Sequence, residues 1–157
     1  MDGGKNNLPK HSVHHVLAHS YLVHLVLLLV AIFLDYIFDY NFFNNSIVVP
    51  VGFVVLLLAT FLIFWAQKTG RDFSNIKGAK TTEHFCRGPY CYTKVPTQWG
   101  LAFLVLGFGL VTNSFFIIVF TVVSFLLSKI LFMGKYDKLL TEKYGDAYVA
   151  YKKLVKF

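Results

Sequence analysis

The sequence has few charged residues for its length, and this scarcity excludes most soluble proteins. Charged side chains make up 15% of the 157 residues and hydrophobic ones 56%, whereas soluble domains average about 25% charged and about 45–50% apolar. A domain of this size leaves much of its surface exposed, so a soluble monomer could not hide this much apolar area. Disordered chains are poor in hydrophobic residues, which excludes disorder as well. We expect residues 1–157 to form a single integral membrane domain.

Cysteine is also scarce, since only Cys86 and Cys91 occur. Two cysteines are too few for a disulfide scaffold, and their spacing is not the paired spacing of a zinc site. We therefore expect ordinary thiols in a reducing compartment.

Long uncharged stretches are what the sequence has instead. Residues 16–34 and 47–66 contain no charged side chain, and a helix needs about 20 such residues to cross a ~30 Å hydrocarbon core. Pro50 lies in the first turn of the second stretch, where its missing N–H costs little. Each stretch is therefore predicted to be a transmembrane helix.

A third uncharged stretch, residues 99–128, is too long for one upright span. As a single helix it would measure about 45 Å, and the turn-forming triplet Thr112-Asn113-Ser114 lies at its middle. The sequence predicts two antiparallel helices instead, over 96–111 and 114–133. The expected fold is thus all-α, with four transmembrane helices that end in a helical hairpin.

The formal net charge of +7 is concentrated in a few places, and we expect it to meet anionic lipid headgroups rather than nucleic acid. The connection 35–46 has no Lys or Arg, whereas the connection 67–98 and the tail are basic. By the positive-inside rule, both termini and the segment 67–95 are predicted to be cytoplasmic. The basic residues of the 67–98 connection are Lys68, Arg71, Lys77, Lys80, Arg87 and Lys94.

The tail, residues 135–157, changes character. Its apolar residues recur every three or four positions and lysines fill the other side, which is typical of an amphipathic helix on the inner membrane surface or against the bundle. Gly145-Asp146 is predicted to break this helix in two, with Asp146 as the N-cap of the second piece.

Most of the histidines cluster near the N-terminus, and they allow two interpretations. His11-Ser12-Val13-His14-His15 is a His-x-x-His-His box of the type that membrane di-iron enzymes combine from several copies. His11, His15 and His19 would share one helix face, which could hold a transition metal. We favour the simpler interpretation, a polar and titratable start of a helix at the headgroup level.

Motifs in the second half of the chain resemble a known family. Gly88-Pro89-Tyr90 is followed by Lys94-Val95-Pro96-Thr97-Gln98-Trp99-Gly100 at the head of the hairpin, and then by Gly107-Phe108-Gly109. After the hairpin come Tyr136-Asp137 and Tyr144-Gly145-Asp146-Ala147-Tyr148, with Tyr151 three residues later. In order and spacing, residues 85–157 resemble the isoprenylcysteine carboxyl methyltransferase and phospholipid methyltransferase superfamily.

The resemblance implies an enzyme that binds S-adenosylmethionine at the cytoplasmic membrane face and methylates a lipophilic or lipid-linked acceptor. In that case Lys94 would pair with the methionine carboxylate, an acidic residue at 136–137 would hold ribose hydroxyls or the substrate amine, and Gly107 and Gly109 would allow close approach to the backbone. The implied cofactor-binding residues are Tyr90, Lys94, Pro96, Gln98, Gly100, Gly107, Gly109, Tyr136 and Asp137.

The sequence departs from the family pattern in three polar parts of the motifs. Lys94-Val95-Pro96 replaces Arg-His-Pro, Gln98 replaces a tyrosine, and Tyr136-Asp137 replaces Glu-Glu. A catalytically silent relative that binds lipid or a membrane partner is therefore the alternative, and a histidine-based metal protein is a third. The motifs do not distinguish among a prenylcysteine carboxylate, a phospholipid amine and a small thiol or amine as the acceptor.

Overall fold

The computed structural model describes residues 11–38, 47–76 and 81–155, with side chains from Ala18 onward in the first range. All regular elements in these ranges are helices. They are α1 (His11–Phe38), α2 (Val48–Ser74), α3 (Thr82–Phe85), the 3₁₀ helix η1 (Gly88–Cys91), α4 (Pro96–Val111), α5 (Phe115–Tyr144) and α6 (Asp146–Leu154).

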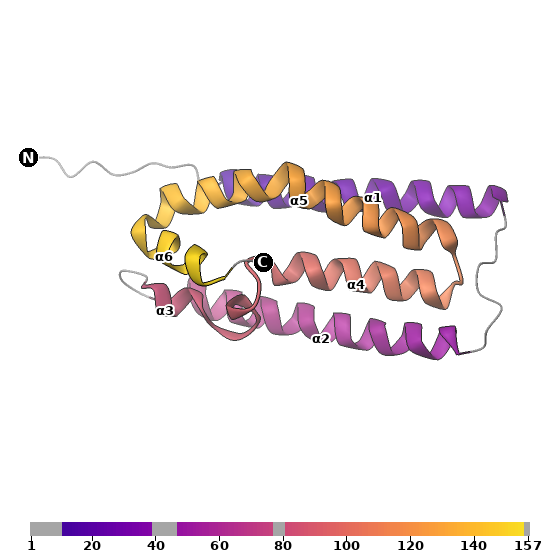
Figure 1. Cartoon of the computed structure of the whole chain (residues 1–157), viewed down its shortest axis with the longest axis horizontal. Coiled ribbons are helices and arrows are strands. Elements are labelled where there is room, and N and C mark those ends of the chain that lie inside the picture. Colours follow the sequence, from indigo (N-terminus) through magenta and orange to yellow (C-terminus); the bar gives the residue numbers. More distant parts are fainter. Residues whose placement is uncertain (1–10, 39–46, 77–80, 156–157) are drawn as a thin grey trace, which may run out of the picture.

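Four long helices run side by side, and the short ones gather at one end of the bundle (Figure 1). Helix α1 packs against α5, α2 packs against α4, and α4 also contacts α5. At the end of the bundle, α3 and α5 both contact α6, while η1 lies against α2. The bundle therefore leads into a small helical cap built from the segments on either side of the α4–α5 hairpin.

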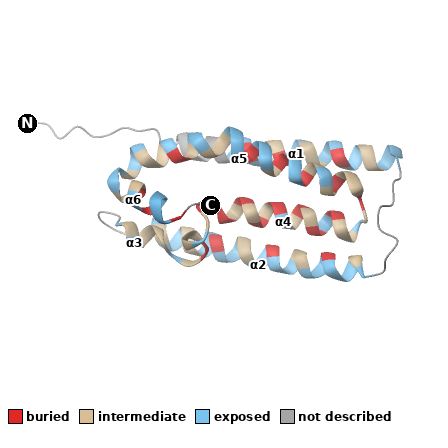
Figure 2. Cartoon of the chain, in the orientation of Figure 1, coloured by how far each residue is buried: buried red, intermediate tan, exposed pale blue. Residues whose placement is uncertain are grey.

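Three of the helices, α1, α2 and α5, are long and apolar enough to cross a membrane, and α4 is a shorter apolar helix. Many residues of the long helices are exposed (Figure 2), and a large share of these are large and apolar. Leu57 is 72% exposed and Ile130 is 76% exposed, which water would penalise strongly. The outer surface is thus suited to lipid, as the composition predicts, and the protein is an integral membrane protein.

The predicted hairpin is confirmed, and its turn lies where the sequence places it. Asn113 adopts a φ of 55°, a left-handed conformation that asparagine tolerates better than most residues. The Ser114 side chain caps the next helix by accepting a hydrogen bond from the Ile117 N–H. The uncharged stretch therefore folds back on itself instead of forming one long helix.

The tail differs from the prediction, because α5 continues without a break past Met133 to Tyr144. No residue between 133 and 144 forces a turn, and Gly134 is accommodated inside the helix. The helix ends at Gly145, whose φ of 58° reverses the chain. Asp146 is the first residue of α6 and makes no side-chain cap, so Gly145 and not Asp146 occupies the N-cap position.

The prediction of two free thiols is wrong, because Cys86 and Cys91 form a disulfide. Between them the chain turns at Gly88, which has a φ of 53°. This turn brings the two Cα atoms to 4.4 Å, within the usual range for a disulfide. The count and spacing of the cysteines could not reveal a chain reversal that lies between them.

Helices α2 and α4 approach closely through small residues. Gly52, Ala59 and Ala66 are the buried residues of α2 and recur every seven positions. A Cβ on Gly107 would lie 3.0 Å from the Leu56 backbone nitrogen and 3.1 Å from the Gly52 oxygen. Small residues at such a crossing allow the van der Waals contact that holds membrane helices together.

Candidate functional site

A cavity of about 470 Å³ lies at the end of the bundle where α2, α5 and α6 meet α3 and η1. Its volume is within the ordinary range for small-molecule sites. Its lining is mixed, with aromatic rings on several sides and hydroxyl, imidazole and ammonium groups between them. The lining residues are Thr69, Gly70, Phe73, Ser74, His84, Phe85, Tyr90, Lys94, Tyr136, Leu140, Lys143, Tyr144, Tyr148 and Tyr151.

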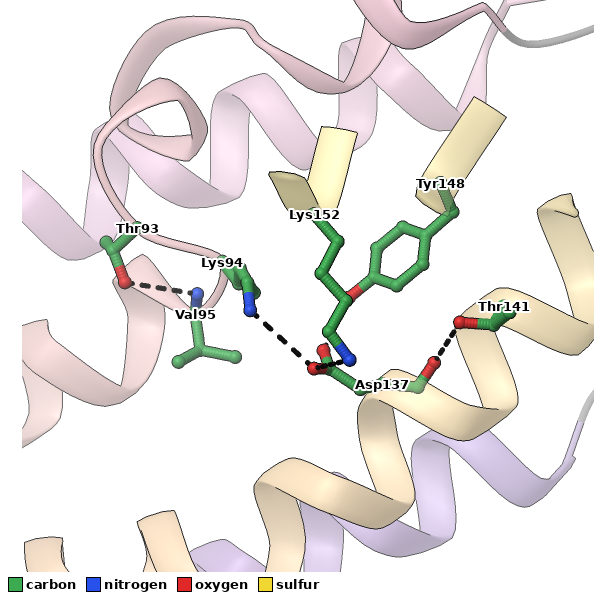
Figure 3. Close-up of polar contacts among 7 residues, drawn as sticks. All are labelled: Thr93, Lys94, Val95, Asp137, Thr141, Tyr148 and Lys152. Atoms are coloured by element: carbon green, nitrogen blue, oxygen red, sulfur yellow. Dashed lines mark hydrogen bonds and ion pairs between the residues drawn. The ribbon is translucent and has the colours of Figure 1, made fainter. Parts of the chain in front are cut away.

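Asp137 is the centre of a polar network beside this cavity (Figure 3). One carboxylate oxygen lies 2.8 Å from the Lys152 Nζ and 3.6 Å from the Lys94 Nζ. The other accepts a hydrogen bond of 2.7 Å from the Tyr148 hydroxyl. Asp137 and Lys94 are both buried, so the charge of each depends on the other for compensation.

Three segments distant in sequence supply this network. Helix α5 runs on past the hairpin and carries Asp137 to the end of the bundle. The reversal at Gly145 sends α6 back alongside, so that Tyr148 and Lys152 face Asp137. Lys94 lies two residues before Pro96, the first residue of α4, and Pro96 favours a helix start at that point.

Aromatic side chains form much of the cavity lining. The Phe85 ring stacks on Tyr151 with centroids 5.5 Å apart and meets Tyr144 edge-on at 5.1 Å. The Tyr151 hydroxyl donates to the Tyr90 carbonyl oxygen at 2.6 Å, which ties α6 to η1. Helix α3 is tied to α6 as well, through the Thr82 hydroxyl and the Ala147 carbonyl at 3.3 Å.

Tyr148 and Tyr151 remain protonated at neutral pH. Burial raises the pKa of Tyr148, and its hydrogen bond to Asp137 raises it further. Burial likewise raises the pKa of Tyr151, with a smaller contribution from neighbouring Tyr90. Each hydroxyl therefore stays a hydrogen-bond donor.

The structure brings together only some of the residues that the family resemblance implies. Tyr90, Lys94 and Tyr136 line the cavity, and Asp137 joins them through its contact with Lys94. Pro96 is buried at the start of α4 and does not line the cavity. Of the predicted site residues, the structure therefore brings together four, which are Tyr90, Lys94, Tyr136 and Asp137.

The other implied residues lie within helix contacts. Gln98 is buried in the bundle, and its Nε2 donates to the Ser20 hydroxyl at 3.1 Å. Gly107 faces α2, as described above, and a Cβ on Gly109 would lie 2.9 Å from the Ile117 Cγ2. Gly100 likewise faces Ile63 of α2. The three glycines thus allow α4 to approach its neighbours closely.

Sequence reasoning missed several residues of the site. Tyr148 and Lys152 bind Asp137 directly, whereas the sequence predicts for the tail only an amphipathic helix on the inner membrane surface or against the bundle. Phe73 and Phe85 line the cavity and carried no motif. The four-residue interval from Tyr148 to Lys152 was a usable signal, because it places both side chains on the same face of a helix.

The histidines show no metal site within the described residues, in which no group of three or more His, Cys, Asp or Glu side chains could hold an ion. His19 is exposed, and His24 is buried in a network with Ser20 and Ser128. The side chains of His11, His14 and His15 lie outside the described part, so the favoured interpretation of a polar helix start stays a prediction, and a metal site stays its alternative.

Comparison with known proteins identifies the family. The family model described as phospholipid methyltransferase matches residues 47–147, well over half of the chain. No curated protein and no solved structure matches the chain. The matched range runs from α2 to the start of α6 and includes Tyr90, Lys94 and Asp137, in agreement with the motif resemblance. The chain therefore belongs to the phospholipid methyltransferase family.

Proposed function

We propose that the protein transfers a methyl group from S-adenosylmethionine to a lipophilic or lipid-linked acceptor. The observation that carries the proposal is the cavity beside the Lys94–Asp137–Tyr148 network. Three of the residues that line it or touch it, Lys94, Tyr136 and Asp137, occupy the positions of the family's polar motifs. The cavity also lies at one end of the apolar helices, where a water-soluble cofactor and a lipid could both reach it.

The residues of the cavity fit the chemistry of this cofactor. Its aromatic adenine has rings to stack against, since Phe73, Phe85 and Tyr144 line the wall. Its carboxylate has a buried cation, Lys94, which also lines the cavity. Bound there, the cofactor would supply an activated methyl group, and transfer by direct displacement would require no protein nucleophile.

The role of the chain's own residues is therefore to bind and orient. Lys94 is shared between Asp137 and the cavity, so its ammonium is held in place before a ligand arrives. Lys152 is closer to Asp137 than Lys94 is, which leaves Lys94 hydrogen-bonding capacity for an anionic group. Such preorganisation reduces the cost of ordering on binding.

Titration calorimetry of the purified protein with S-adenosylhomocysteine tests the cofactor site. Lys94→Gln should weaken binding about tenfold or more, as the loss of a charged hydrogen bond predicts. The matched control is Lys153→Gln, which removes an exposed lysine of α6 and should leave binding unchanged. Equal affinities for the two variants would contradict the assignment of Lys94.

A second experiment tests the reaction. Membranes that contain the protein are incubated with S-adenosylmethionine carrying a radiolabelled methyl group, and the lipid extract is counted. The expected result is label in the organic phase that depends on the protein and falls in Lys94→Gln at cofactor concentrations below saturation. Cofactor binding without transferred label would contradict the enzymatic proposal and leave the binding site intact.

The second candidate, a catalytically silent relative that binds lipid or a membrane partner, is favoured by a specific observation. Asp137 is already engaged by Lys94, Lys152 and Tyr148, and Val95 stands where the family pattern has a histidine. A carboxylate with this many internal partners has less capacity for a ligand. Absence of both binding and transfer, in a protein with intact helix content, is the outcome that selects this candidate.

A further inference from the structure

The Cys86–Cys91 disulfide links two sides of the cavity in the helical cap (the cap cavity). Cys86 lies where α3 ends, and Cys91 is the last residue of η1. Helix α3 packs on α6 at the cap end of the bundle (Figure 1), whereas η1 packs on α2. The bond therefore ties the α6 side of the cap to its α2 side.

Each cysteine is the chain neighbour of a residue that lines this cavity. Phe85 precedes Cys86 and Tyr90 precedes Cys91, and both line the cavity. The Tyr151 side chain joins the two, because its ring stacks on Phe85 and its hydroxyl donates to the Tyr90 carbonyl oxygen at 2.6 Å. A shift of either cysteine is therefore transmitted to the cavity wall.

Cys86 also contacts the residues that position α6. It packs against the buried cluster formed by Tyr148, Tyr151 and Val155. Tyr148 in turn donates to Asp137 at 2.7 Å, the carboxylate at the centre of the polar network beside the cavity. The disulfide thus supports both the aromatic wall and the polar network.

The pair lies at a surface that solvent reaches. Cys86 and Cys91 are both partly exposed, Arg87 between them is exposed, and Tyr92 is 77% exposed. Thiol–disulfide exchange requires that a thiolate reach one of the two sulfur atoms. The chain contains no third cysteine, so the attacking thiol has to come from another molecule.

The location of the pair and the size of its loop both argue against a purely structural role. The basic segments around it predict a cytoplasmic location, where disulfides are usually transient and either redox-sensing or catalytic. The two cysteines are only 5 positions apart, and a disulfide that closes so short a loop constrains the unfolded chain less than one that closes a long loop. Its main effect is therefore to position α3 and η1 in the folded protein.

We propose that Cys86 and Cys91 form a reversible redox-modification site that exchanges with an external dithiol and thereby controls the affinity of the cap cavity. A thiolate of the dithiol attacks one Sγ, the S–S bond breaks, and the other Sγ leaves as a thiolate that takes up a proton. The second thiol of the reagent then displaces the first Sγ, which is protonated in turn. The pair gains two electrons and two protons, and the reagent becomes a disulfide. An external disulfide reverses the reaction.

The two states differ in how firmly the cavity wall is held. In the disulfide form, α3 and η1 are held together before a ligand arrives. In the dithiol form this covalent link is lost, so a ligand has to order the two segments when it binds, and its affinity falls. The effect on the cofactor rests on the proposed function, whereas the loosening of the cap does not.

Alkylation tests the exchange on the full chain in phosphatidylcholine nanodiscs. The protein is treated with dithiothreitol and then, after its removal, with oxidised glutathione, and free thiols are trapped with N-ethylmaleimide and detected by mass spectrometry. We expect both cysteines to be trapped after the first step and neither after the second, without bound glutathione and with helix content unchanged. A pair that is reduced only in denaturant, or that does not re-form, would overturn the proposal.

Hydrogen–deuterium exchange tests the link between the pair and the cap, and it uses no cofactor. Dithiothreitol should speed amide exchange in α6 about tenfold, whereas amides in the middle of α4 should be unaffected. The matched control combines Cys86→Ser with Cys91→Ser, which should exchange rapidly in α6 at the outset and should not respond to dithiothreitol. Equal exchange in the oxidised and reduced parent protein contradicts the proposal, and so does a response of the serine variant, because the reagent would then act elsewhere.

Titration calorimetry with S-adenosylhomocysteine tests the effect on the cavity. The oxidised protein should bind about tenfold more tightly than the reduced protein, and the serine variant should bind like the reduced protein. Equal affinities in the two states would mean that the pair does not control the cavity. Absence of binding in both states would contradict the proposed function instead, and hydrogen exchange would still decide whether the pair loosens the cap.

Discussion

Asp137 shows how one carboxylate can organise a site at the residue scale. It is contacted by two ammonium groups and one phenol, which come from the α4 start and from α6. Breaking a buried ion pair leaves one charge uncompensated. The resulting loss of stability is larger than the stabilisation that an exposed ion pair provides. Lys152 is partly exposed, with 45% of its side chain accessible, whereas Lys94 is 9% accessible. The Lys94 contact is therefore the more consequential of the two.

The first prediction concerns Tyr148. Tyr148→Phe removes the hydroxyl that donates to Asp137 but keeps the ring against Phe85. Loss of this hydrogen bond to a charged group should lower the free energy of unfolding by about 1–3 kcal/mol. Urea unfolding in mild detergent, followed by circular dichroism, measures the change. Tyr92→Phe, at a position that is 77% exposed, is the control and should have no effect.

The second prediction concerns Asp137 itself. Asp137→Asn leaves Lys94 buried without its countercharge, so Lys94 should become available to an anionic ligand while the protein loses stability. If Lys94 binds the cofactor carboxylate, calorimetry should show a binding enthalpy that remains measurable in Asp137→Asn and is lost in Asp137→Asn combined with Lys94→Gln. Loss of binding in the single variant, with helix content intact, would instead mean that Asp137 contacts the ligand.

Glycines illustrate the element scale, because their roles depend on the helix surface they occupy. Gly107 lies where α4 touches the α2 backbone, whereas a Cβ on Gly134 would meet nothing within 4 Å. Both glycines lie inside helices, so sequence alone assigns them the same unfavourable helix propensity. Only the packing partners of α4 and α5 separate a glycine that is required from one that is tolerated.

The third prediction follows from this difference. Gly107→Ala forces a Cβ against backbone atoms of α2 at 3.0 Å and should destabilise the α2–α4 pair. Gly134→Ala fits without contact and should stabilise the protein by about 0.5–1 kcal/mol, because alanine has the better helix propensity. Thermal unfolding of the two variants should therefore shift the midpoint in opposite directions, and a shift of the same sign in both would contradict the packing described here.

The fourth prediction concerns the segment that joins α3 to η1. The Cys86–Cys91 disulfide closes a short loop next to Phe85 and Tyr90, both of which line the cap cavity. By loop-closure entropy, such a short loop stabilises the fold by roughly 2 kcal/mol. Replacing both cysteines by serine should lower the free energy of unfolding by about that amount. Mass spectrometry after alkylation should find no reactive thiol in the purified protein before reduction and two thiols afterwards.

Much of the fold could be predicted from sequence, because apolar run length and turn residues act locally. The uncharged stretches predicted the four long helices, and Thr112-Asn113-Ser114 predicted the hairpin. Their ends were less predictable: α5 continues through polar residues to Tyr144, because packing against α6 outweighs the change in composition. Pattern alone also could not predict the disulfide, which depends on the turn at Gly88.

The candidate site was predictable only where the motif lies near the cavity. Lys94, Tyr90 and Tyr136 line it, whereas Gly107 and Gly109 lie inside helix contacts. Tyr148 and Lys152 join the site because the chain reverses at Gly145. Contacts of this kind depend on how distant segments meet, which sequence spacing along one helix does not specify.

At the scale of the whole molecule, two observations bear on which end of the bundle faces the cytoplasm. The cap end carries the basic segments, including Arg87, Lys143 and Lys153, and the positive-inside rule assigns such segments to the cytoplasm. The same end holds the disulfide, and disulfides persist mainly in oxidising compartments. We give the charges more weight, because they act during insertion, before a disulfide in the folded segment can form.

The last prediction tests this orientation. A reporter fused after Phe157 and another inserted between Gly78 and Ala79 should both be cytoplasmic, because basic residues surround both positions and the predicted transmembrane hairpin would cross the membrane twice between them. In intact cells, Cys86 and Cys91 should then be exposed to cytoplasmic thiol reductants, so alkylation with a membrane-permeable reagent before lysis should label both. If both reporters lie on the outer side and the two cysteines are not alkylated in cells, the positive-inside rule fails for this protein. The disulfide would then indicate the correct orientation. Reporters on opposite sides would mean that the chain crosses the membrane only once between the two positions, so that α4 and α5 would not form a transmembrane hairpin.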